Sequence, residues 1–377
     1  MIDRNRFTAI ASLDLSKAFD SIDHTLLLNK LAKLDLAEQT LKWIKSYLRD
    51  RKQRTKFGSL LSAEETVKSG VPQGSILGPL LFLCFTNDLP DSFDRDTKIL
   101  SYADDTQLCL DADSIEELVQ KIENVITKAQ HWYETNSMKN NIGKTEILIL
   151  NIGKWKNEKP KIKIMQNLKQ VVIKPKEHIK ILGVYVDSNL NWNKQISHVK
   201  KKALNVTRHI HRVNHTLPVK HRIQLYTSLI EPHFSYADLI WGGCGKVNSQ
   251  KLQTVQNFAV KSITGNKKRD SATQSFQKLK FLNLEQRRNI HDIVFTHKSL
   301  LFKNPDTISA LYMNQLPTGD TRQAYNGTLT LPKHRTSKYQ QGPLYRSIKA
   351  WNQCPVQETG NIKHHKQLVQ KLKIAEM

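Results

Sequence analysis

Two adjacent carboxylates, Asp104 and Asp105, are the clearest candidates for chemistry in the sequence. They follow Tyr102 and Ala103 and lie between two short apolar runs, 98–101 and 107–110, a pattern that predicts a β-hairpin with its turn at the carboxylates. Two such charges about 4 Å apart repel by roughly 4 kcal/mol at an effective dielectric of 20. Mg²⁺ offsets this repulsion and prefers oxygen ligands. The alternative is a solvated Asp-Asp turn, the usual role of an isolated pair.

A third carboxylate and a glycine-containing loop accompany the pair. Asp14 ends the mostly apolar segment 7–15, which predicts a buried strand with Asp14 at its carboxyl end. The loop Gly-Val-Pro-Gln-Gly at 70–74 precedes a helix predicted over 76–87. Gly74 lets the backbone approach a ligand, and the start of the helix offers free N–H groups to a phosphate. Gln73 both donates and accepts hydrogen bonds, as contact with a base or sugar requires.

The elements that must position these residues are predicted from hydrophobic spacing. Helices are expected over 25–36, around 43–48 and over 115–129, the last with a capping box at Ser114 and Glu117. A strand is expected over 145–151 and another over 181–187. Between them, in 154–180, we expect short strands with their lysines facing outward.

The second half of the chain has a helical period. A helix with a basic face is predicted beyond residue 195, followed by helices over 219–230 and 249–263, the latter ended by Gly265. The last seventy-odd residues are predicted to be loop-rich, with a short basic helix near 364–375.

The charge favours a polyanionic partner. The 377 residues carry a net charge of +24, which points to nucleic acid or an anionic membrane, although a merely soluble basic protein is the alternative. The basic segment 49–56 is interpreted either as a solvated face or as a lining for a phosphate backbone.

Cysteine usage and hydropathy predict an intracellular, soluble protein of the nucleus, the cytoplasm or both. The four cysteines are far apart and form no C-x-x-C pair, which fits a reducing compartment and argues against a zinc ribbon. His209, His211 and His215 have no suitably placed cysteine, so no zinc is expected. The longest apolar run, 76–85, is too short for a bilayer, and no membrane partner is expected.

The order of these motifs resembles a known family. Asp14, the 70–74 loop and Tyr-Ala-Asp-Asp resemble motifs A, B and C of reverse transcriptases. The amino-acid sequences of segments 13–24 and 70–82 are similar to those of non-LTR retrotransposon polymerases of the jockey type. The resemblance extends over nearly the whole chain, through a motif D at 141–145, a primer-grip region at 182–184 and 190–192, and the segments 281–288 and 350–355.

The resemblance implies an α+β fold: a right-hand polymerase palm with an antiparallel sheet and packed helices, then an α-helical thumb and a loop-rich C-terminal region. The implied domains are a palm with partial fingers at 1–152, the palm end with primer-grip strands at 153–194, a thumb at 195–300 and a basic C-terminal region at 301–377. Because motif A begins at residue 14, the resemblance predicts an N-terminally truncated member.

The resemblance also implies the activity, an RNA-directed DNA polymerase that adds deoxynucleotides to the 3′-hydroxyl of a DNA primer on an RNA template. Two Mg²⁺ ions, with Mn²⁺ as a substitute, would be held by Asp14, Asp104 and Asp105. Lys144 would lie near the leaving pyrophosphate. The implied nucleotide-binding and primer-grip residues are Phe19 against the sugar 2′ position, Gln73, Gly74, Tyr102, Leu182 and Gly183.

Two other functions remain open at this stage. One keeps the fold without catalysis, as a relic that only binds RNA or DNA. The other is an RNA-dependent RNA polymerase, against which Phe19 and the Tyr-Ala-Asp-Asp sequence argue. Asp20 is interpreted as a helix cap rather than a metal ligand, and His24 receives no role. The oligomeric state is not predicted.

Overall fold

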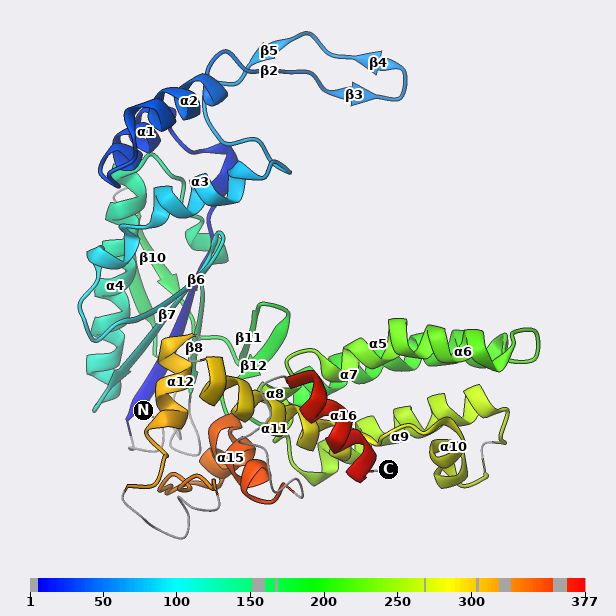
Figure 1. The fold of residues 1–377 in the computed structure, drawn as a ribbon. Coiled ribbons are helices and arrows are strands. Elements are labelled where there is room, and N and C mark those ends of the chain that lie inside the picture. The colour runs from blue at the N-terminus through cyan, green and yellow to red at the C-terminus, as the bar shows by residue number, and fades with distance from the viewer. Residues whose placement is uncertain are drawn as a thin grey trace. The chain divides into compact units, whose positions relative to one another are not determined.

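The computed structural model describes residues 6–150, 160–166, 169–267, 269–302, 305–318, 327–354 and 365–376 (Figure 1). The chain divides into two compact units, Met1–Ile179 and Lys180–Met377. The first unit combines a sheet with helices, whereas the second is mostly helical. The mixed helix-and-strand class expected from the sequence is therefore confirmed.

An antiparallel sheet forms the centre of the first unit, with the strand order β6-β7-β1-β8. Its strands are β1 (Phe7–Leu13), β6 (Lys98–Tyr102), β7 (Asp105–Ala112) and β8 (Glu146–Leu150). β1 lies in the middle of the sheet, between β7 and β8, and its Ala9, Ala11 and Leu13 side chains are buried. The predicted strand before Asp14, the hairpin and the strand after residue 145 are all confirmed.

Helices pack around this sheet. They are α1 (His24–Ala32), α2 (Glu38–Leu48), α3 (Leu77–Thr86) and α4 (Ile115–Thr135). α4 packs on β1 and β7 (Figure 1) and buries Ile122 and Ile126. At the start of α4 the Ser114 hydroxyl accepts a hydrogen bond from the Glu117 amide. The Glu117 carboxylate accepts a hydrogen bond from the Asp113 amide, whereas in a standard capping box it would accept one from the Ser114 amide. The first predicted helix was too long, since α1 ends at residue 32.

A β-arm over residues 52–66 was not predicted. β2 (Lys52–Gln53) pairs with β5 (Glu65–Thr66), and β3 (Lys56–Phe57) pairs with β4 (Leu60–Leu61). The basic segment 49–56 is exposed and leads into one side of this arm. Its cations are partly neutralised, because Lys52 and Arg54 both pair with Glu64 at 2.8 and 2.6 Å.

Two short hairpins follow. β9 (Ile162–Gln166) pairs with β10 (Lys169–Ile173), and along β9 Ile162 and Ile164 are buried while Lys163 is exposed, as predicted. β11 (His178–Ile181) and β12 (Val184–Asp187) form the second hairpin, which contains the boundary between the two units. The single strand predicted over 181–187 is therefore wrong, because the chain turns at Leu182 and Gly183 with φ of 43° and 87°.

Long helices build the first part of the second unit. They are α5 (Asn193–Arg212), α6 (Val219–Leu225), the π-helical turn η5 (Tyr226–Ile230), α7 (Glu231–Ser235), α8 (Asp238–Trp241), α9 (Lys246–Thr264) and α10 (Ala272–Leu279). α5 and α9 pack side by side (Figure 1), and the core between the helices includes Tyr226 and Trp241. Gly265, with φ of 79°, ends α9 as predicted.

The C-terminal part is more helical than predicted. Its helices are α11 (Leu284–Phe302), α12 (Asp306–Met313), α14 (Ser337–Gln341), α15 (Pro343–Asn352) and α16 (His365–Glu376). α12, α15 and α16 pack on α11, and Ile293, Ile348 and Leu368 share a core. The predicted basic C-terminal helix is confirmed by α16. Within the described residues, no helix is both long and apolar enough to cross a bilayer.

Candidate active site

The register of the central sheet brings the three predicted carboxylates together. Leu13, the last residue of β1, lies opposite Thr106 of β7. Asp14, which follows β1, and Asp105, the first residue of β7, therefore lie at the same end of two neighbouring strands. Tyr102 and Asp105 close the hairpin, and the turn between them consists of Ala103, with φ of 51°, and Asp104. The hairpin turn therefore places two carboxylates beside the end of the central strand.

The charges of the three groups influence one another. The pKa of Asp105 is raised above its ordinary value, mainly by partial burial, then by the charge of Asp104 and after it by that of Asp14. This is the response expected when carboxylates share a site without a counterion. The arrangement raises the affinity of the site for any cation that reaches it.

The Oδ2 atom of Asp14 is the strongest indication of a cation-binding site. This atom is buried and accepts no hydrogen bond. Within the described part of the chain, it pairs with the Lys144 ammonium, whose Nζ lies 3.3 Å away. Lys144 ends the 3₁₀ turn η4 (Ile142–Lys144), which is fixed to the strand end because the Asn141 amide donates to the Asp14 carbonyl over 3.1 Å. Lys144 therefore lies beside Asp14.

The donor set fits a hard divalent cation. Among the described residues, no three His, Cys, Asp or Glu side chains are arranged as a metal-binding group. A buried carboxylate oxygen without a hydrogen bond is nevertheless the kind of ligand that Mg²⁺ takes, and Mg²⁺ needs only one or two carboxylates alongside substrate phosphates. Lys144 supplies positive charge at this position.

Phe19 and the 69–75 loop lie together beside this edge. Phe19 belongs to the 3₁₀ turn η2 (Ala18–Asp20) and stacks on Phe82 of α3 with ring centroids 4.6 Å apart. Its carbonyl accepts from the Val71 amide over 2.9 Å. Phe19 is half-buried and therefore remains partly accessible to solvent.

The loop is held by contacts that the sequence did not predict. The His24 ring bonds to the Gly70 carbonyl over 2.7 Å, which gives His24 a role. Gly70 has φ of 89°, and a Cβ there would lie 2.7 Å from the Asp20 Cα. The Asp20 carboxylate accepts from Gln73 Nε2 over 2.8 Å. The interpretation of Asp20 as a helix cap is wrong, because Asp23 caps α1.

Beyond Gln73 the loop opens toward α3. Gly74 has φ of 78°, and no atom lies within 4 Å of where its Cβ would be, so its backbone is accessible. One of the helix N–H groups expected to be free is already used, since the Gly78 amide donates to the Ser75 hydroxyl over 2.9 Å. Tyr102, by contrast, is 68% exposed and has an open face beside the hairpin turn.

The predicted primer-grip residues belong to the second unit. Leu182 and Gly183 form the turn between β11 and β12 rather than part of a continuous strand. Tyr236 secures this turn, because its hydroxyl donates to the Leu182 carbonyl over 2.6 Å and its ring lies 3.4 Å from where a Cβ of Gly183 would be.

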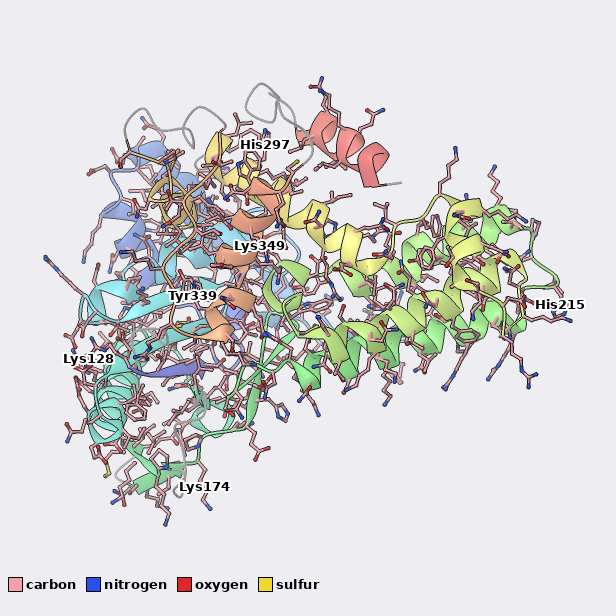
Figure 2. All side chains as sticks on the ribbon, turned by 90° about the horizontal axis from the view of Figure 1, so that it is seen from below. Lys128, Lys174, His215, His297, Tyr339 and Lys349 are labelled. Carbon is pink, nitrogen blue, oxygen red and sulfur yellow. The ribbon has the colours of Figure 1, made fainter. Side chains whose placement is uncertain are left out.

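A basic helix face also lies in the second unit. α5 buries Ile196, Val199 and Ala203 on one side. The opposite side exposes the cations Lys200, Lys201, Lys202, Arg208 and Arg212. His215, which follows α5, marks the far end of this helix in Figure 2. The predicted amphipathic helix with a basic face is confirmed.

Comparison with known proteins gives a consistent result. Residues 3–186 match the family model for reverse transcriptase (RNA-dependent DNA polymerase). The chain is 27% identical over 271 residues to a probable RNA-directed DNA polymerase from transposon BS of Drosophila melanogaster, covering 70% of this chain and 29% of that protein. It is 26% identical to the X-element polymerase of the same species, covering 67% and 28%.

A third relative is the RNA-directed DNA polymerase from mobile element jockey of Drosophila funebris, 24% identical over 274 residues, with 70% of this chain and 29% of that protein covered. The chain thus spans less than a third of the length of these relatives. The solved apo telomerase from Candida tropicalis aligns with 75% of this chain and 45% of its own, at 11% identity and a TM-score of 0.38, too low to support an argument.

Proposed function

We propose that the chain acts as an RNA-directed DNA polymerase of the non-LTR retrotransposon kind, because residues 3–186 match the reverse transcriptase family model and the chain is similar to the polymerases of transposon BS and mobile element jockey. The observation that carries the proposal is the junction of Asp14 with the Asp104–Asp105 turn at one sheet edge. A buried carboxylate oxygen without a hydrogen bond completes that argument.

The three carboxylates are the proposed ligands of two Mg²⁺ ions. Bound there, these ions would supply Lewis-acid activation of the primer 3′-hydroxyl and neutralise charge on the triphosphate. Asp14 offers Oδ2 from the end of a rigid central strand, while Asp104 and Asp105 offer theirs from a tight turn. Lys144, which pairs with Asp14, would then offer its ammonium group to the charge that develops on the pyrophosphate.

The surrounding residues are assigned to the incoming deoxynucleotide. The exposed part of the Phe19 ring would occupy the space that a ribose 2′-hydroxyl needs, and stacking on Phe82 fixes the ring. Gln73 is oriented by its hydrogen bond to Asp20, so its amide oxygen and its second N–H group are available to the nucleotide. Gly74 and Tyr102 would line the same pocket from the loop and the hairpin.

For nucleic acid we assign the template and primer to the basic surfaces. The first unit would supply the palm with partial fingers (1–152), and the palm end (153–194) would span the boundary between the units at Ile179 and Lys180. The second unit would supply a thumb (195–300) and a basic C-terminal region (301–377). The exposed cations of α5 would contact phosphates, and Leu182 with Gly183 would contact the primer backbone.

The test is incorporation on an RNA template carrying a short DNA primer, with Mg²⁺ and either deoxynucleotides or ribonucleotides. We expect extension with deoxynucleotides and little with ribonucleotides. Extension that prefers ribonucleotides would overturn the role of Phe19 and favour an RNA polymerase. Binding of the primer–template without extension by either set would leave only the binding function of a catalytically inactive relic.

A further inference from the structure

A cavity of about 590 Å³ lies within the second unit, lined by residues of α9, α11 and the α14–α15 segment. Lys349, labelled in Figure 2, belongs to its α15 wall. The volume is within the range of small-ligand sites. Its charged lining residues are mostly basic, namely Lys246, Arg288, Arg346 and Lys349 against Glu285 and Asp292.

Arg288 is the most informative group in this lining. It is 8% exposed, and although Nη1 donates to the Ser249 hydroxyl over 2.9 Å, its Nε and Nη2 atoms have no hydrogen-bond partner. Its guanidinium also lies over the Trp241 ring, 5.3 Å from the centroid. Burial is the main factor that lowers the pKa of Arg288. A buried cation with donors that reach no acceptor costs stability unless an anion approaches.

The nearby carboxylates are already paired with other groups. Asp292 accepts from Arg346 through both oxygens, over 2.6 and 2.9 Å. Asp238 accepts from the His291 ring over 2.7 Å. Because these carboxylates are paired with Arg346 and His291, Arg288 keeps its Nε and Nη2 donors available for an anion in the cavity.

The backbone at the start of α9 points to the same ligand chemistry. α9 has 19 residues, and its N-cap, Gly245, has no side chain to satisfy the first N–H groups. A Cβ at Gly245 would meet no atom within 4 Å, so the space beside the helix start is open. A Cβ at Gly243, by contrast, would overlap the Gln341 carbonyl, which explains a glycine there. Helix starts of this kind carry partial positive charge and bind phosphate oxygens.

We propose that this cavity binds a phosphate group of a nucleic acid strand, through the N–H groups at the start of α9, the ammonium groups of Lys246 and Lys349, and the charge of Arg288. The choice of a nucleic acid strand rests on the proposed polymerase function. The same phosphoryl chemistry is offered by free phosphate compounds, so the experiment includes both sources.

The test uses residue-resolved lysine labelling of the full chain with an amine-reactive reagent, read by mass spectrometry. It is run alone, with a twelve-nucleotide RNA, and with pyrophosphate. We expect the RNA to slow labelling of Lys246 and Lys349 several-fold and to leave Lys298 unchanged, an exposed lysine of α11 outside the cavity lining. Equal labelling of all three lysines with RNA would overturn the site. Protection by pyrophosphate but not by RNA would overturn the assignment to a strand.

Variants separate the site from the general positive charge. Lys246 and Lys349 are exposed, so the double variant Lys246→Gln/Lys349→Gln is expected to fold. For this variant, the slope of the logarithm of the RNA-binding constant against the logarithm of salt concentration should be shallower than for the wild type by about 1. A change of about 1 corresponds to one neutralised phosphate. The matched variant Lys298→Gln/Lys371→Gln has the same charge change and should leave the slope unaltered. Equal slopes for both variants would contradict the proposal.

A third variant addresses the buried cation. Arg288→Gln should remove the protection from labelling that RNA gives to Lys246 and Lys349, and circular dichroism should show that the chain is folded. If Arg288→Gln unfolds, the double variant Lys246→Gln/Lys349→Gln tests the site instead. Labelling requires no catalysis, so Asp104→Asn should show the same protection as the wild type. A chain that extends primers without this protection would refute the cavity site alone, and a protected chain without extension would refute polymerase activity alone.

Discussion

At the scale of single residues, Asp14 and the Asp104–Asp105 turn meet at the same end of β1 and β7, and Lys144 pairs with Asp14. Local apolar runs predict the strand before Asp14 and the hairpin that carries Asp104 and Asp105, but the pairing of β1 with β7 that brings them together is long-range and was implied only by the family resemblance. Pairs such as Gln73 with Asp20, separated by 53 residues, depend on how the loop folds back and have no local signature. The same holds for His24 and the Gly70 carbonyl.

Lys144 and a divalent cation should compete for Asp14. Because the Lys144 side chain is 66% exposed, the pair is a weak one, and Lys144→Met is expected to strengthen Mg²⁺ binding only roughly two- to fivefold. Calorimetric titration of the nucleotide-free chain measures this. Lys139→Met, at an exposed neighbouring lysine with the same charge change, is the control. An affinity that is unchanged in Lys144→Met, or raised equally in both variants, would contradict the competition.

Asp105 should make stability depend on pH in the absence of metal. Its pKa is raised in the folded chain, so between the ordinary value near 3.8 and the raised one the folded state binds more protons. The free energy of unfolding therefore falls as pH rises through that window, and the decrease persists above it. We expect Asp105→Asn to be more stable than the wild type in urea at pH 7 with chelator.

The control for this variant is Asp111→Asn, which removes a carboxylate paired with Arg6 at 2.8 Å and should lower stability or leave it unchanged. Excess Mg²⁺ should stabilise the wild type more than Asp105→Asn, since a ligand that binds only the folded state adds stability. A wild type more stable than Asp105→Asn in chelator would show that no repulsion exists at the site.

At the scale of elements, predictions succeeded where one periodicity ran uninterrupted and failed at turns. The long helices α4, α5 and α9 have continuous apolar stripes and were identified. The turn at Leu182 was hidden, because apolar residues on both sides resemble one strand. Loop was predicted where α15 forms, since the burial of Ile348 and Trp351 depends on the presence of α11.

The loop before α3 should be sensitive to a single methyl group. Gly70→Ala adds a Cβ against the Asp20 backbone at a φ of 89°, which should cost about 1–3 kcal/mol of strain. Gly58→Ala, at a φ of 59° with open space, should cost only about 1 kcal/mol. Urea unfolding of both variants provides the comparison. If both variants lose the same free energy of unfolding, the close approach between Gly70 and Asp20 does not add to the cost of a Cβ at Gly70.

At the scale of the whole molecule, charge rather than any single contact should control binding. The net charge of +24 was evident from composition and the basic face of α5 from its helical spacing, but the packing that leaves this face in solvent is seen only in the structure. The division into two units with separate cores likewise depends on long-range packing that periodicity does not report.

The basic face of α5 should set the salt dependence of primer–template binding. Reversing Lys200, Lys201 and Arg208 to Glu is expected to reduce the log–log salt slope by about 1 for each phosphate that the helix no longer neutralises. A second triple variant with the same charge change, at the exposed Lys163, Lys298 and Lys371, should alter the slope much less. If both triples change the slope alike, the binding is spread over the surface and α5 has no special part.

The most direct measurement is the rate of primer extension on an RNA template with deoxynucleotides and Mg²⁺, compared between the wild type and Asp104→Asn. The substitution keeps the size of the side chain in the hairpin turn and removes one of three charges that converge there. We predict extension by the wild type and a decrease of at least about a hundredfold in the variant, a change of about 3 kcal/mol in the barrier. Equal rates in the two chains would contradict a catalytic role for the carboxylates.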